Sequence, residues 1–138
     1  MSLISQIRAI FTNGDLTRNT LSLLALLSDE VDILDKVVTV AVSTTTLTLS
    51  RELHHGKTLL FQNAAGCTVT VPNNLEPGFT CILIQDAVGQ VTLSAGGGVS
   101  FLVTASKSAP YKTADQGSQL GLQQIDQTVR IAVGGNLA

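Results

Sequence analysis

Short runs of alternating apolar and polar residues, separated by turn residues, fill the stretch from Lys57 to Thr92. In residues 67–71 (CTVTV) apolar side chains alternate with hydroxyls, which is the period of a strand with one buried and one exposed face. Pro72 stops this strand, because proline cannot donate a hydrogen bond to a ladder. The stretch contains almost no reactive groups, so the pattern predicts a β-rich surface and not an active site.

Residues 81–84 (CILI) break the alternation, since all four positions are apolar. They follow the turn signal Glu76-Pro77-Gly78. A continuous apolar run is typical of a strand that is buried on both faces. We therefore expect a central strand, or a strand that another subunit covers.

The period of two continues from Lys36 to the C-terminus and predicts eight or nine short strands. Their ranges are 37–42, 44–49, 57–62, 67–71, 79–85, 90–93, 99–103, 120–125 and 128–133. We expect residues 36–138 to form a mainly β domain, either a small antiparallel sandwich or a jelly-roll-like barrel. Residues 105–118 carry no strand pattern, which favours an exposed loop or an arm lying on a neighbouring subunit.

Residues 1–35 have a helical period instead. Apolar residues recur at helical spacing over 2–11 and again over 16–34, where Asp15 can cap the second helix. The second helix carries about two and a half heptads, too few for a free-standing coiled coil. The residues expected to anchor or oligomerise the chain are Leu3, Ile7, Ile10, Phe11, Leu24, Leu27, Val31 and Leu34. The alternative is a helix that folds back on its own β-domain.

Charged residues make up 13% of the chain and apolar residues 44%. The charged share is about half of the usual one, so a monomer would lack polar side chains to cover itself. No apolar stretch approaches the ~18 residues needed to cross a bilayer. We assign the excess hydrophobicity to subunit interfaces and expect a homo-oligomer, with no membrane as a partner.

The formal net charge is -2, with eight basic residues scattered along the chain. Nucleic acid is therefore not an expected partner, because no basic stripe exists to neutralise phosphates. The N-terminus does not resemble a secretory signal, and we expect synthesis in a cytoplasm. Cys67 and Cys81 are then expected to be reduced, buried small hydrophobes.

The residues that could carry chemistry fit no complete site. His54 and His55 would point to opposite faces of an extended segment, which favours a solvated turn over an axial metal site in a trimer. The spacing of Cys67 and Cys81 matches no zinc motif. Four acids, Asp29, Glu30, Asp32 and Asp35, are interpreted as a solvated helix face or as a contact with Arg8 or Arg18 of a neighbouring chain. We predict no metal and no cofactor.

Catalytic patterns are equally incomplete. Residues 96–98 (GGG) are followed by no Lys-Ser or Lys-Thr pair, so they predict a turn and not a phosphate loop. No serine lies in a nucleophile-elbow pattern, and neither histidine has an acidic partner in the sequence. We therefore expect a protein that is not an enzyme.

Several segments together resemble a known group of proteins. They are GCTVTVP at 66–72, L.PGFTC.LIQ at 75–85, GQVTLSAGGGV at 89–99, a polar connection with Tyr111, and GGNLA at 134–138. Their order resembles a small β-domain that recurs in bacteriophage tail fibres, head fibres and other virion surface proteins. The resemblance covers residues 46–138, about two thirds of the chain.

The resemblance implies a structural protein of the virion, assembled in the host cytoplasm. Because such modules are commonly three-fold, it implies a homotrimer that contacts other capsid or tail proteins. The short chain favours a capsid decoration or head-fibre protein anchored by its N-terminal helices. The alternative is a tail-fibre or receptor- or carbohydrate-binding module that uses Asn73, Asn74 and Tyr111. Aromatic residues make up only 4% of the chain, which argues against this alternative because sugar sites use exposed rings.

Overall fold

The computed structural model describes residues 38–138, which form one compact unit. The two predicted helices lie outside the described residues. So do the predicted anchor residues Leu3, Ile7, Ile10, Phe11, Leu24, Leu27, Val31 and Leu34, and the acids at positions 29–35.

The described residues are mainly β, as predicted. The strands are β1 (Thr39–Val42), β2 (Thr46–Thr48), β3 (Lys57–Phe61), β4 (Cys67–Val71), β5 (Thr80–Gln85), β6 (Val91–Ala95), β7 (Ser100–Leu102), β8 (Gln119–Gln124) and β9 (Arg130–Gly135). Each overlaps one predicted range. The helix α3 (Arg51–His54) was not predicted, because its single turn is too short to show a helical period.

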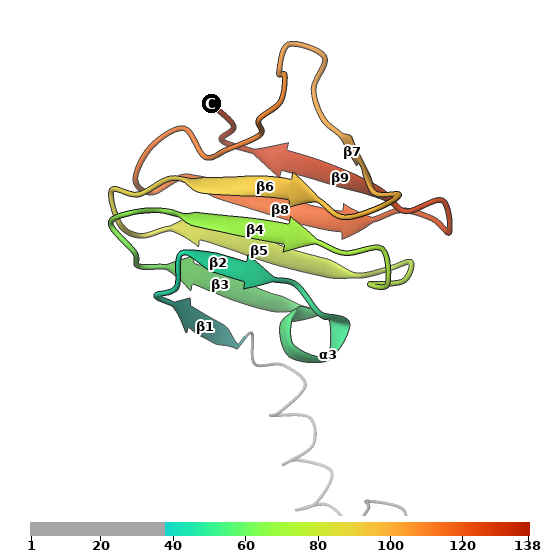
Figure 1. Cartoon of the computed structure of the whole chain (residues 1–138), viewed down its shortest axis with the longest axis horizontal. Coiled ribbons are helices and arrows are strands. Elements are labelled where there is room, and N and C mark those ends of the chain that lie inside the picture. Colours follow the sequence, from blue (N-terminus) through green and yellow to red (C-terminus); the bar gives the residue numbers. More distant parts are fainter. Residues whose placement is uncertain (1–37) are drawn as a thin grey trace, which may run out of the picture. The chain divides into compact units, whose positions relative to one another are not determined.

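Two sheets lie face to face (Figure 1). The large sheet has the strand order β1-β3-β5-β8-β9-β7, and the small sheet has the order β2-β4-β6. Neighbours are parallel from β1 to β5 and throughout the small sheet, whereas β8 is antiparallel to both β5 and β9. The predicted antiparallel sandwich or jelly roll is therefore wrong in strand direction, because the large sheet is mixed and the small sheet is parallel.

The parallel pairing arises because the chain changes sheet after each of its first strands. β1, β3 and β5 enter the large sheet, while β2, β4 and β6 enter the small one (Figure 1). Each turn of this coil adds one strand to each layer, as in a short β-solenoid. Apolar alternation reports which face is buried but not which way the neighbouring strand runs, so it did not distinguish the two arrangements.

The hydrophobic core lies between the sheets. Leu59, Leu83 and Leu120 are side by side on the large sheet, and Val69 faces inward from the small sheet; all four have no exposed surface. Burying side chains of this size contributes roughly 1.5–3 kcal/mol each. The inward positions of the alternating pattern are thus committed to packing, and the outward positions remain for function.

Candidate functional site

The small sheet turns a hydroxyl face outward. Thr46, Thr68 and Thr92 lie side by side on adjacent strands, and the next outward row is Thr48, Thr70 and Ser94. Threonine is a good strand residue that keeps this face soluble. We call these six residues the hydroxyl face.

The large sheet turns a different surface outward, which we call the outer face. Its rows are Ala41, Leu60, Ile84 and Gln119; then Thr39, Thr58, Ile82, Gly121 and Gly134; then Thr80, Gln123, Ala132 and Leu102. Ile82 keeps 44% of its surface exposed and Leu102 keeps 52%. None of these residues is charged, so the outer face joins aliphatic side chains to glycines and neutral polar groups.

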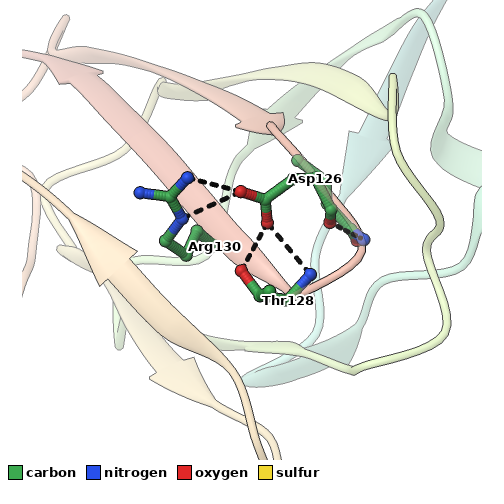
Figure 2. A network of polar contacts seen from close by, with 4 residues as sticks. Asp126, Thr128 and Arg130 are labelled. Carbon is green, nitrogen blue, oxygen red and sulfur yellow. Dashed lines mark hydrogen bonds and ion pairs between the residues drawn. The ribbon is translucent and has the colours of Figure 1, made fainter.

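A polar turn borders the outer face where β8 passes into β9 (Figure 2). One carboxylate oxygen of Asp126 accepts from the backbone N–H of Thr128 at 3.0 Å and from its hydroxyl at 2.6 Å. The other accepts from Arg130 Nε at 3.0 Å and pairs with Nη2. These hydrogen bonds, Arg130 first, lower the pKa of Asp126 to about 2. The group orders an exposed turn, and such ion pairs contribute little to stability.

The two histidines have separate structural roles. His54 is buried at the end of α3, where its Nδ1 accepts the backbone N–H of Ser50 at 2.8 Å. His55 is exposed, accepts the N–H of Thr80 at 3.2 Å and packs against Phe79. The predicted solvated turn is therefore wrong for His54, because the segment is helical and turns this ring inward. Burial lowers the pKa of His54, and the nearby charge of Lys57 lowers it further.

Both cysteines are buried and free, in agreement with the prediction. Cys67 lies on β4 in the small sheet and Cys81 on β5 in the large sheet. Burial raises the pKa of both thiols, that of Cys81 to about 12. Thiolate, the reactive form, is therefore scarce at neutral pH.

A buried polar cluster closes one end of the sandwich. The Thr113 hydroxyl donates to Gln85 Oε1 and accepts the backbone N–H of Val91 at 2.9 Å. Gln85 Nε2 donates to the carbonyl of Ala87 at 2.9 Å, and Gln90 Nε2 donates to the carbonyl of Thr113 at 2.8 Å. Each partner is satisfied by protein groups, which marks the cluster as structural.

The other residues considered for a binding site are also engaged in turns, hydrogen bonds or packing. Gly98 has φ +79 in the turn at 96–98, and a Cβ on Gly96 would lie 2.9 Å from the Val71 carbonyl oxygen, so this segment is the predicted turn. Asn73 Nδ2 donates to the Gly97 carbonyl at 3.0 Å. Tyr111 packs edge-on against Phe101, with ring centroids 5.8 Å apart.

The segment at 105–118 contains no strand, as predicted, but its second half packs on its own domain. Thr113 and Ser118 are buried there, and two isolated bridges join Lys112 to Thr92 and Thr113 to Leu137. Residues 104–110 are mostly exposed.

Within residues 38–138, no three His, Cys, Asp or Glu side chains lie close enough together to hold a metal ion. In the same part of the chain, no helix is both long and apolar enough to cross a membrane. Packing and hydrogen bonding engage the other candidate residues described above. The hydroxyl face and the outer face remain, both uncharged, and the outer face is the more apolar.

Sequence reasoning found one strand of the outer face. The run at 81–84 predicted a central strand, or a strand that another subunit covers. β5 is central in the large sheet, and Ile82 and Ile84 lie on its outer face. The contribution of β8 and β9 was missed, because Gly121 and Gly134 carry no pattern of their own. Their position on the outer face follows only from the pairing of strands across the sheet.

No protein-family model matches this chain, and no curated protein matches it significantly.

Proposed function

We propose that this chain is a non-enzymatic structural protein of a bacteriophage particle, a homotrimeric capsid decoration or head-fibre protein anchored by its N-terminal segment. The resemblance of residues 46–138 to phage virion modules motivates the class. The observation that carries the proposal is the outer face, an uncharged surface whose exposed aliphatic side chains include Ile82 and Leu102. Surfaces of this kind mark contacts between proteins.

The experiment is to purify particles of the phage that encodes the chain and to identify their proteins by mass spectrometry. Immunogold labelling then locates the chain on the particle. Gold on the head is the expected result. Gold confined to the tail rejects the head assignment, and particles without the chain reject the proposed function altogether.

A receptor- or carbohydrate-binding module is the second candidate. The hydroxyl face favours it, because rows of hydroxyl groups can exchange hydrogen bonds with a glycan. The packing of Tyr111 against Phe101 disfavours it, since that ring is half-buried and engaged by its neighbour. Saturable binding of the purified chain to host cells or to a glycan array would support this second candidate.

A further inference from the structure

The outer face carries aliphatic residues where a solvated sheet would carry polar ones. β5 lies at the centre of the large sheet, and its inward residues Cys81 and Leu83 are buried. Its outward residue Ile82 keeps 44% of its surface exposed. Continuous apolar strands belong to sheets that are covered on both faces. Within residues 38–138 only one face of β5 is covered, so this strand is built for a second layer.

Charge is kept at the margins of the outer face. The nearest charged residues at outward positions are Asp86, beyond Ile84, and Arg130, before Ala132. Lys57, at the start of β3, falls in the inward register of Cys81. Asp126 already pairs with Arg130. This is the distribution of a protein contact, in which charged residues are depleted at the centre. It suits a contact between copies in particular, because copies of one face bring like charges together if the face carries any.

The shape of the outer face also fits a second copy. Ile82 lies directly opposite Gly121, which lies opposite Gly134. A Cβ added to either glycine would meet nothing within 4 Å, so the row consists of an aliphatic ridge beside an open hollow. A ridge and a hollow on the same face can fill each other in neighbouring copies.

We propose that copies of this chain contact one another through the outer face, with Ile82 of one copy over Gly121 and Gly134 of the next. The contact deepens the self-association proposed above and rests on it, but it does not depend on where the protein lies on a particle. It differs from the predicted helical anchor, which lies outside the described residues.

The size of the sheet limits the area of this contact. With strands about 4.8 Å apart and about 20 Å long, the outer face spans roughly 500 Å² per copy. A contact of about 1,000 Å² in total lies at the low end of specific interfaces. We therefore expect association through this face in the micromolar range.

The test uses the full chain with two cysteines introduced on the outer face, Ile82→Cys with Gly134→Cys. These positions are two strands apart, about 10 Å, which exceeds the ~7 Å limit between Cα atoms for a disulfide within one chain. A disulfide must then join two copies. The matched control is Thr46→Cys with Thr92→Cys, also two strands apart but on the hydroxyl face. The native cysteines, Cys67 and Cys81, are buried and do not compete for the introduced thiols.

Under mild oxidation at micromolar concentration, the outer-face pair should give reductant-sensitive dimers and trimers at several times the yield of the control. Ile82→Lys should weaken association by at least about tenfold in sedimentation velocity, because it buries an unpaired charge. Thr68→Lys, on the hydroxyl face, should leave association unchanged. Circular dichroism confirms that each variant folds.

Equal cross-linking of the two pairs, or unchanged association of Ile82→Lys, would overturn the proposed contact. Particle composition separates this outcome from failure of the proposed function. Particles that carry the chain without outer-face cross-links reject the contact and keep the virion assignment. Cross-linked chains that are absent from particles keep the contact and reject the virion assignment.

Discussion

At the scale of single residues, His54 makes stability depend on pH. Its Nδ1 accepts the Ser50 N–H at 2.8 Å, so the folded state needs the neutral ring, and burial lowers its pKa below the ordinary 6.5. As pH falls below 6.5 the unfolded chain binds a proton that the folded chain resists. The stabilisation is therefore complete above pH 6.5 and is lost as pH falls toward the lowered pKa. Urea unfolding between pH 7.5 and 5 should show a falling free energy of unfolding.

His54→Asn is the variant that isolates this effect, because the asparagine oxygen can accept the same N–H and does not titrate. The pH dependence between 7.5 and 5 should become shallower in this variant. His55→Asn is the matched control and should keep the dependence that His54 causes. A slope unchanged by His54→Asn would contradict the assignment.

Val129 carries backbone strain at the turn between β8 and β9. Its φ is +56, a left-handed conformation that β-branched residues rarely adopt. Asparagine tolerates this region, so Val129→Asn should raise the free energy of unfolding by about 1 kcal/mol. Glu76, with φ +68, is a comparison with an unbranched side chain, and Glu76→Asn should gain less. Chemical denaturation measures both, and a loss of stability in Val129→Asn would show that its packing outweighs the strain.

At the scale of elements, the turns of successive coils stack on one another. The turn at 63–66 closes with a 3.0 Å bond from Gly66 N–H to the Asn63 carbonyl, and Cys67 N–H donates to Gln90 in the next coil. Gly89 fits between them, because a Cβ there would lie 2.0 Å from Gly66 N and 2.4 Å from the Asn63 oxygen. A side chain at position 89 would force two coils apart.

Gly89→Ala should therefore lower the free energy of unfolding by about 2–3 kcal/mol, the effect of overpacking against backbone that cannot yield. Gly97→Ala is the matched control, since a Cβ there meets nothing within 4 Å. It should change stability by less than about 0.5 kcal/mol. Similar losses in the two variants, measured by urea unfolding, would show that coil stacking does not depend on Gly89.

The elements also show what the sequence could and could not predict. Strand positions were predictable because burial on one face imposes a period of two on each strand. Strand direction was not predicted from this period. The sequence does carry a signal of a coiled repeat, because hydroxyl-apolar-hydroxyl triplets at 46–48, 68–70 and 92–94 recur about every 22–24 residues. The outer face was predictable where apolar residues run together at 81–84. Its glycine half needed the register that places Gly121 beside Ile82.

At the scale of the whole molecule, side chains hold the last connection against both sheets. Thr113 reaches Gln85 in the large sheet through its hydroxyl, while its backbone N–H donates to the carbonyl of Val91 in the small sheet at 3.0 Å. It also forms an isolated bridge with Leu137 near the C-terminus. The sandwich is thus closed here by a hydrogen-bonded cluster and not by another strand of either sheet.

Two buried glutamines make this closure testable. Gln85→Met keeps the volume of the side chain. It leaves the buried Thr113 hydroxyl without its acceptor and removes the hydrogen bond to the Ala87 carbonyl. It should therefore lower the free energy of unfolding by about 2–3 kcal/mol. Gln124 is equally buried, but within residues 38–138 its Oε1 has no partner and its Nε2 reaches only the Asp126 carbonyl, at 3.1 Å.

Gln124→Met removes a desolvated atom together with one hydrogen bond, and it should therefore change the free energy of unfolding by less than about 1 kcal/mol. Thermal and urea unfolding of the two variants gives the comparison directly. Because both substitutions bury the same methionine, a difference between them reports the hydrogen bonds and not the volume. Equal losses would mean that the Thr113 cluster adds nothing beyond packing, and that the contacts between the sheets alone keep this end of the molecule closed.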